Sequence, residues 1–254
     1  MKMPVLFVGH GSPMNAIEDN EFTRMWEVIG REIPKPKAIL AVSAHWYTDG
    51  SRTSDDENPK LVYDMYGFPK ALYEVEYPVK GSPELAESIR ELVNHPVEID
   101  NKWGIDHGTW SVLCKMYPEA DIPVLQLSID YNLPPEAHYK IGEKLKSLRA
   151  EGVLIFASGN IVHNLSLVNW NMEAEYPWAH EFDDYIKTKI EQGDFLAAVD
   201  YKSAGSCSEK AFYTPDHYYP LLYALGAAET GESVQVFNDK CVMGALSMTS
   251  YRIG

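Results

Sequence analysis

Three of the eight histidines in this sequence follow short apolar segments, in positions that suit a metal site. They are His10, His45 and His163. Neutral imidazole is a common ligand of zinc and of iron. The three lie far apart along the chain, which excludes a local zinc-finger knot. A shared site must therefore be assembled by the fold; the alternative for each histidine alone is a hydrogen-bonding residue of a turn or the core.

The segments before these histidines have the pattern of buried strands. Pro4–Val8 and Val153–Ala157 are nearly continuous apolar runs, typical of strands covered on both faces by helices. Ala38–Ser43 is a third candidate. Loops from the carboxyl ends of parallel strands converge at one edge of an open α/β sheet, where ligands bind. We therefore predict a shared site at that edge.

Two further histidines stand at the starts of predicted helices. Asp216 suits a helix cap, so His217 is either part of the site or incidental. Asp106 is a second candidate cap, and the positive end of the helix dipole there disfavours a charged His107. A neutral His107 is either a base near pH 7 or a packed loop residue. The sequence has no G-x-S-x-G, P-loop or G-x-G-x-x-G motif, which leaves a histidine metal centre as the strongest chemical interpretation.

Strand and helix patterns alternate along the chain. The predicted strands are Pro4–Val8, Ala38–Ser43, Pro123–Ile129, Val153–Ala157, Ser233–Asn238 and one near Ala245–Ser250. The predicted helices are Pro83–Val93, Ala137–Leu148, Trp178–Gln192 and His217–Glu229. Thr48–Lys60 is expected to be a surface loop, and His138 and His180 to be exposed on helices. The alternation predicts an α/β fold: a single domain over residues 1–254, with a mixed or mostly parallel central sheet flanked by helices and the metal site at the carboxyl-terminal edge of the strands.

The composition and the net charge limit the classes of partner that the protein can bind. Thirty-seven acidic against 22 basic residues give a formal charge of −15, which repels phosphate backbones and anionic lipid surfaces. We therefore expect neither a nucleic-acid nor a membrane partner. Three well-separated cysteines, Cys114, Cys207 and Cys241, indicate a reducing compartment, and we expect a cytoplasmic protein.

Five motifs occur in an order that resembles a known family. They are His10-Gly11-Ser12-Pro13, Ser43-Ala44-His45-Trp46, Asp106-His107-Gly108-Thr109-Trp110, Ser158-Gly159-Asn160-Ile161-Val162-His163-Asn164-Leu165 and Pro215-Asp216-His217-Tyr218-Tyr219-Pro220. Together they resemble the DOPA 4,5-dioxygenase branch of the class III extradiol ring-cleaving dioxygenases over essentially the whole chain. The aromatic residues of these motifs either line a slot for a substrate ring or pack in the core; they are Trp46, Trp110, Tyr218 and Tyr219.

The resemblance implies an Fe(II)-dependent enzyme that opens the ring of a catechol with O2. The catechol is DOPA-like or simpler, and the product is a muconate-type semialdehyde. The resemblance implies metal ligation by His10, His45 and His217. It places His163 near enough to ligate or to act as an acid/base, and we predict both roles for it. It places His107 in the pocket, where we predict a catalytic acid/base.

One departure from the wider superfamily concerns the metal. Better-known ring-cleaving members complete a triad with a glutamate, whereas here His217 takes the late position. All-imidazole ligation suits zinc as well as iron, and zinc binds more tightly than Fe(II) but cannot activate O2. We expect Fe(II) to support activity and Zn(II) to occupy the site of purified protein. Two alternatives remain open: a zinc-dependent hydrolase on the same site, and a non-catalytic metal-binding scaffold. The sequence does not specify the oligomeric state.

Overall fold

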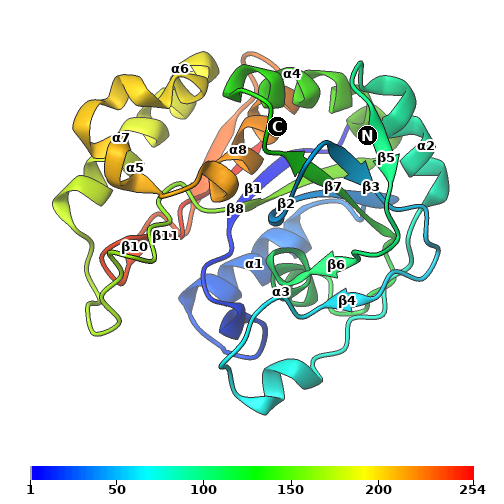
Figure 1. The fold of residues 1–254 in the computed structure, drawn as a ribbon, viewed down its shortest axis with the longest axis horizontal. Helices are drawn as coiled ribbons and strands as arrows, with labels where there is room; N and C mark the ends of the chain where they lie inside the picture. The colour runs from blue at the N-terminus through cyan, green and yellow to red at the C-terminus, as the bar shows by residue number, and fades with distance from the viewer. Residues whose placement is uncertain (1) are drawn as a thin grey trace.

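One eight-stranded sheet organises the computed structural model, which describes residues 2–254 (Figure 1). The strand order is β5-β3-β7-β2-β8-β1-β12-β9. These strands are β1 (Val5–Gly9), β2 (Ala38–Thr48), β3 (Ser51–Thr53), β5 (Val97–Ile99), β7 (Val124–Asp130), β8 (Val153–Gly159), β9 (Val234–Phe237) and β12 (Ser250–Ile253). Two small sheets pair β4 (Leu61–Val62) with β6 (Ile105–Asp106) and β10 (Cys241–Val242) with β11 (Leu246–Ser247).

The centre of the large sheet is parallel. Strands β7, β2, β8 and β1 run in one direction. Beyond β1, strand β12 is antiparallel to β1, and β9 is in turn antiparallel to β12. Every residue of β1 and β8 is buried. Along β1 the side chains alternate, with Val5 and Phe7 in one core cluster and Leu6 and Val8 in the other. The predicted α/β fold with a mostly parallel sheet between helices is confirmed.

Helices cover both faces of the sheet (Figure 1). One face packs against α1 (Glu21–Glu32) and α3 (His107–Met116). The other packs against α2 (Pro83–Leu92), α4 (Pro135–Leu145), α5 (Pro177–Glu191), α6 (Phe195–Val199), α7 (Ser208–Ala211) and α8 (Tyr219–Ala227). Short 3-10 helices are η1 (Pro13–Ala16), η2 (Lys70–Glu74), η3 (Lys146–Glu151), η4 (Tyr201–Cys207) and η5 (Pro215–His217). Within residues 2–254, no helix combines the length and apolar character needed to cross a membrane.

Several local predictions were wrong. The expected loop Thr48–Lys60 contains β3, because the Thr53 hydroxyl and backbone continue the sheet beyond β7. The strand expected near Ala245–Ser250 is two strands, β11 and β12. The last predicted helix begins at Tyr219, with His217 in the preceding turn.

Two further differences concern helices. Helix α1 was not predicted; a capping box between Asn20 and Thr23 starts it, and its buried face is narrow. His138 was expected to be exposed and is fully buried, because Tyr219 and Tyr223 of α8 cover its ring.

Candidate metal centre

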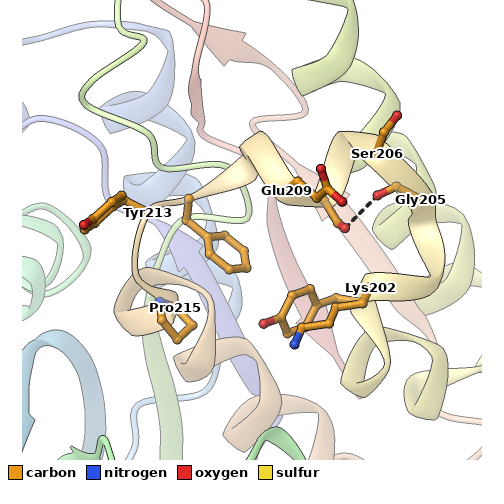
Figure 2. A pocket seen from close by; sticks show the side chains of 9 residues that line it. Lys202, Gly205, Ser206, Glu209, Tyr213 and Pro215 are labelled. Atoms are coloured by element: carbon orange, nitrogen blue, oxygen red, sulfur yellow. Dashed lines mark hydrogen bonds between the residues drawn. The ribbon is translucent and has the colours of Figure 1, made fainter.

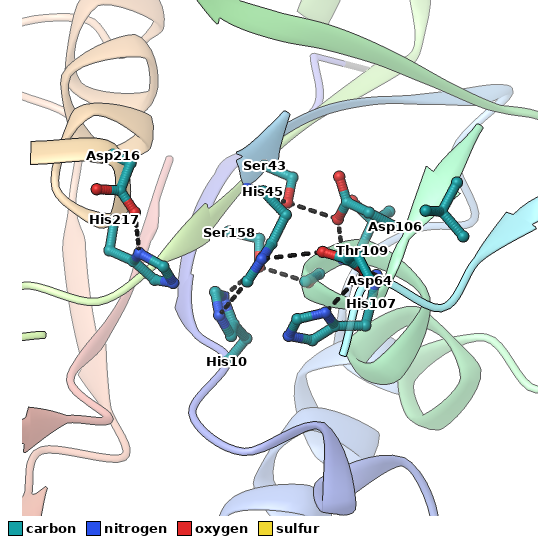
Figure 3. A network of polar contacts seen from close by, with 12 residues as sticks. His10, Ser43, His45, Asp64, Asp106, His107, Thr109, Ser158, Asp216 and His217 are labelled. Carbon is teal, nitrogen blue, oxygen red and sulfur yellow. Dashed lines mark hydrogen bonds and ion pairs between the residues drawn. The ribbon is translucent and has the colours of Figure 1, made fainter. Parts of the chain in front are cut away.

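Three imidazoles meet just after β1 and in the last part of β2, and we call them the three-histidine centre: His10, His45 and His217 (Figure 3). Their ring centroids lie 5.0 to 5.2 Å apart. One nitrogen from each ring lies within 4.8 Å of the other two. His10 directly follows β1, His45 lies in β2 past an irregularity in its pairing with β7, and His217 ends η5.

Two glycines permit the close approach of these elements. At Gly159, the end of β8, a Cβ would lie 2.1 Å from the His217 carbonyl oxygen, which accepts a hydrogen bond from the Asn160 N–H. At Gly108 a Cβ would lie 2.8 Å from the His45 ring. A larger residue at either position would push η5 or the start of α3 away from the centre.

The Nδ1 atom of each imidazole in the centre has a hydrogen-bond partner. His10 pairs with Ser158 at 3.0 Å, His45 with Asp64 at 3.0 Å, and His217 with Asp216 at 2.5 Å. Carboxylates only accept, and the Ser158 hydroxyl already donates to the Gly108 carbonyl. Each Nδ1 therefore carries the hydrogen that it donates, and each Nε2 is left to face the centre.

These atoms suit a divalent metal. The Nε2 atoms of His10 and His45 lie 3.1 Å apart, and the buried Nε2 of His217 has no hydrogen-bond partner in the structure. A buried polar nitrogen without a partner is costly unless a ligand satisfies it. Metal-bound histidines almost always hold the second ring nitrogen against a carboxylate or another acceptor. The donor set thus fits zinc or iron.

Asp64 was not singled out from the sequence, yet it connects two histidines. Its carboxylate accepts from Nδ1 of His107 at 2.9 Å, from the His107 backbone N–H at 3.1 Å, and from His45 through its other oxygen. The pairing of β4 with β6 brings Asp64 beside the start of α3. His45, Asp64 and His107 form a second group that could hold a metal. Because both Asp64 oxygens already accept hydrogen bonds, we assign Asp64 to orientation.

His107 opens α3, as predicted. The Asp106 side chain caps the helix by accepting from the Thr109 N–H, and it also accepts from Ser43 Oγ at 2.6 Å and Gln126 Nε2 at 2.8 Å. This network fixes the helix start against β2 and β7. The His107 ring lies 3.8 Å from the His45 ring, between centroids.

Burial sets the protonation of the imidazoles. It lowers the pKa of His10 and of His217 well below the ordinary value, and the neighbouring histidines lower both further. Burial also lowers the pKa of His107, with His45 adding to the effect. Burial also acts to lower the pKa of His45, but the hydrogen bond to Asp64 and the charge of Asp106 outweigh burial and raise this pKa overall. Since neutral imidazole is the ligand form, metal binding and protonation compete at His45.

His163 lies in the same cavity but outside the group of three. Its ring stacks on His217 with centroids 3.5 Å apart and planes 4° from parallel. Its backbone N–H donates to the Ala211 carbonyl at 2.8 Å. Burial lowers the pKa of His163 to about 4. Its roles as ligand and as acid/base stay predictions, as do the roles of the other site histidines.

A cavity of about 240 Å³ opens over the centre. Its lining residues are His10, Gly11, Ser12, Pro13, His45, Met65, Phe68, His107, His163, Leu165, Trp170, His217, Met243 and Leu246. Of the two interpretations of the motif aromatics, the structure supports packing in the core: they are buried and do not line this cavity. They are Trp46, Trp110, Tyr218 and Tyr219. The apolar wall comes from loops after β4 and β8. These loops have no periodic pattern, so their place in the cavity wall could not be predicted from the sequence.

A larger cavity of about 590 Å³ lies beside η4 and α7 (Figure 2). Tyr201, Lys202, Glu209 and Tyr213 are among the residues that line it, and its lining includes no histidine. The chemistry therefore points to the smaller cavity.

Comparisons with known proteins show which sequences and folds this chain resembles. Residues 4–254 match the family described as the catalytic LigB subunit of aromatic ring-opening dioxygenase. A 4,5-DOPA dioxygenase extradiol of Escherichia coli is 47% identical over 262 residues, covering 100% of this chain and 95% of the relative. One from Beta vulgaris is 38% identical, covering 97% and 94%. A crystal structure of an uncharacterized Escherichia coli K12 protein superposes with a TM-score of 0.88 at 42% identity, covering 100% of both chains.

Proposed function

The chain belongs to the LigB family of aromatic ring-opening dioxygenases, and we propose that it cleaves a catechol at its three-histidine centre. It is an oxidoreductase of the extradiol ring-cleaving type. The observation that carries the proposed site is the orientation of the imidazoles. Three rings donate through Nδ1 to fixed acceptors and turn Nε2 toward one point in a cavity.

We assign His10, His45 and His217 as the metal ligands, with His163 as a further ligand in the substrate-free enzyme. Fe(II) at this position would supply the coordination sites and the electrons that the reaction of O2 with an aromatic ring requires. Zinc fits the same nitrogens, so purified protein is expected to contain some zinc that does not support turnover.

His107 is placed to move the catechol proton. Asp64 accepts from its Nδ1, so Nε2 keeps a free lone pair on the cavity side of a ring that burial keeps neutral. A neutral imidazole within reach of a hydroxyl is an efficient base near pH 7. His163, which stacks on His217, lines the same cavity, and burial lowers its pKa to about 4, so it is also neutral, which suits the return of a proton to the opened ring.

The substrates are O2 and a small catechol, which is DOPA-like or simpler. The relatives from Escherichia coli and Beta vulgaris carry the name 4,5-DOPA dioxygenase extradiol. Cleavage outside the two hydroxyls puts both oxygen atoms of O2 into a muconate-type semialdehyde. Residues 1–254 act as one catalytic domain, and the cytoplasm is the compartment we propose.

The test is oxygen uptake by metal-reconstituted protein. We expect the Fe(II)-loaded enzyme to consume one O2 per catechol and to form a yellow semialdehyde, and the Zn(II)-loaded enzyme to bind catechol without consuming O2. Hydrolysis of an ester or amide at equal rates with and without O2, or stoichiometric Fe(II) with no catechol turnover, would contradict the proposal.

A further inference from the structure

The three imidazoles of the centre do not have equivalent partners. His45 and His217 each donate through Nδ1 to a carboxylate. His10 donates to the Ser158 hydroxyl, which is neutral. The three-histidine centre therefore offers a metal three uncharged nitrogens and no carboxylate of its own. Non-haem Fe(II) oxygenases commonly hold the metal with two histidines and one carboxylate. In this protein, negative charge for the ion must come from the carboxylates behind the histidines.

Of these two carboxylates, Asp64 and Asp216, only Asp216 serves a single imidazole. Its Oδ2 accepts from His217 Nδ1 at 2.5 Å, and its Oδ1 accepts from the Thr214 hydroxyl. Because both oxygens accept, neither carries a proton, and the negative charge lies directly against the His217 ring. Asp64 instead accepts from two imidazoles and a backbone N–H, so its charge is shared. Asp216 is therefore the carboxylate whose charge acts most directly on one nitrogen of the centre.

The position of Asp216 on η5 keeps its charge effective. The side chain of Asp216 is 20% exposed and that of His217 is 7% exposed, so solvent screens this pair less than a surface pair. The turn is fixed, because the His217 carbonyl accepts from the Asn160 N–H at 2.9 Å. Figure 3 shows the Asp216 carboxylate on the side of the His217 ring away from His10. Burial lowers the pKa of His163 to about 4, and the charge of Asp216 opposes this shift, so the charge also reaches the cavity.

We propose that Asp216 is a positioning residue that acts through His217 to supply the centre with the negative charge that its three imidazoles lack. The inference rests on the proposed function, because it takes the three-histidine centre as the metal site. A carboxylate against Nδ1 raises the basicity of a ligating imidazole. A nearby negative charge also favours Fe(III) over Fe(II). Asp216 therefore tightens metal binding and lowers the reduction potential of bound iron.

The test separates the charge of Asp216 from its orienting hydrogen bond. Asparagine has the shape of aspartate and keeps an oxygen that can accept from Nδ1, so Asp216→Asn removes only the charge. Asp216→Ala removes the charge and the acceptor. In competition with a chelator, Asp216→Asn should bind Zn(II) about 10–100-fold more weakly than wild type, and Asp216→Ala at least as weakly. In a redox titration of the iron-loaded protein, the Fe(III)/Fe(II) potential of Asp216→Asn should be more positive than that of wild type.

Two controls accompany these measurements. Glu175→Gln neutralises a carboxylate that pairs with His180 Nδ1 at 2.9 Å, outside the centre. It should leave the Zn(II) affinity and the iron potential as in wild type. NMR of the ring nitrogens in metal-free Asp216→Asn should show His217 still protonated on Nδ1, which confirms that the orienting hydrogen bond remains.

Each contrary outcome has a defined meaning. Wild-type affinity and potential in Asp216→Asn, with losses only in Asp216→Ala, would show that Asp216 orients His217 without supplying charge, which overturns the inference. A loss in Asp216→Asn with the His217 proton moved to Nε2 overturns it too, because the changed tautomer explains the loss. An equal loss in Glu175→Gln assigns the effect to the net charge of the protein and has the same consequence. If wild type binds neither metal, the proposed function itself fails.

Discussion

The two ends of strand β1 each carry a buried polar cluster, and the clusters differ in whether their hydrogen-bonding atoms are all paired with protein. Before β1, the fully buried Arg149 donates to the Met3 carbonyl, the Ala227 carbonyl and both carboxylate oxygens of Glu232, at 2.7 to 2.9 Å. After β1, the three-histidine centre pairs each Nδ1 and leaves the Nε2 atoms facing one another.

The difference indicates what each cluster is for. A buried charge with a complete set of partners serves the fold, because removing one partner leaves the other uncompensated. Atoms that are buried, oriented and left without protein partners suit a ligand instead. The comparison predicts that damage at the two ends will have opposite consequences for stability and for metal binding.

The largest expected effect is loss of metal from the centre. His10→Ala and His217→Ala should each abolish stoichiometric binding of Fe(II) and Zn(II), and with it oxygen uptake, because each removes one of three converging nitrogens. The fold should remain, since the site lies at the rim of a large core. Elemental analysis measures the metal content of each variant, and circular dichroism checks that the variant is folded. His180→Ala, at an exposed histidine, is the control. Full metal content in both variants would refute the ligand assignment.

Next in size is the loss of proton transfer. His107→Ala should retain the metal and bind catechol, but turnover should fall by about 10²–10⁴-fold. His163→Ala should lower both metal occupancy and turnover, because we assign it both roles. Metal analysis and oxygen uptake on the same samples distinguish the two patterns. Wild-type turnover in His107→Ala would remove His107 from the mechanism.

A substitution in the Arg149 cluster before β1 should change the stability of the fold and leave metal binding unchanged. Glu232→Gln should lower the free energy of unfolding at pH 7 by about 3 kcal/mol, because it leaves the Arg149 charge buried without its partner. Metal content and turnover of the folded protein should not change. Urea unfolding measures the effect. Glu229→Gln is the control, since Glu229 forms only an exposed pair with Lys2 and should matter by less than about 1 kcal/mol.

The free energy of unfolding is measured at pH 7 because the direction of the Glu232 pKa shift determines the pH range in which this ion pair stabilises the fold. Burial alone would raise the pKa of Glu232, but hydrogen bonds from Arg149 and Lys2 overcome it and lower the pKa to about 2. The stability from this pair is therefore complete above the ordinary pKa of a glutamate. It declines as the pH falls toward 2. A Glu232→Gln effect that vanished at pH 7 and grew in acid would contradict the assignment.

Asp64→Asn tests whether the metal is held by the three-histidine centre or by the second group, which contains Asp64. We expect a smaller loss of metal affinity than in His10→Ala. If Asp64 only orients His45 and His107, the variant should lose about 10–100-fold in metal affinity or activity. If Asp64 itself ligates, occupancy should vanish as in His10→Ala. Competition with a chelator of known affinity gives the number, and Asp55→Asn on the exposed surface is the control.

Asp64 also shows where prediction from the sequence ends. The strand-end histidines could be predicted to converge because long apolar runs specify β1, β2 and β8, and parallel neighbours must bring their following loops to one edge. Asp64 depends on the two-residue pairing of β4 with β6, which leaves no periodic pattern. The cavity walls come from loops of the same kind.

His138 was misplaced for a related reason. Its own helix carries Lys140 and Lys144 nearby, which indicates a surface. The covering side chains, Tyr219 and Tyr223, belong to α8, and the packing of α4 on α8 cannot be read from α4 alone. His217 was left open on similar grounds, because its place depends on the close approach that Gly159 permits.

His138 supplies the smallest prediction and sharpens the comparison, since it is a buried imidazole outside both clusters. Burial lowers its pKa to about 4, and Nδ1 pairs with the Tyr223 hydroxyl at 3.1 Å. Between pH 6.5 and 4 the unfolded chain binds a proton at this residue and the folded chain does not. His138 therefore favours folding above pH 6.5, and this contribution is lost as the pH falls toward 4.

The change is His138→Gln, compared with wild type in metal-free protein at pH 7, 6 and 5. The loss of packing lowers the free energy of unfolding of the variant equally at every pH, so it does not change how that free energy varies with pH. The variant has no imidazole at this position to bind a proton on unfolding. Its free energy of unfolding should therefore fall less steeply with acid than that of wild type, by up to about 1.4 kcal/mol per pH unit. His180→Gln, at a side chain that is 61% exposed, controls for the loss of a histidine. Parallel curves for His138→Gln and wild type would mean that His138 takes up its proton without unfolding. Burial alone would then not keep an imidazole neutral here, and the lowered pKa values of His10 and His217 would depend on their neighbouring histidines.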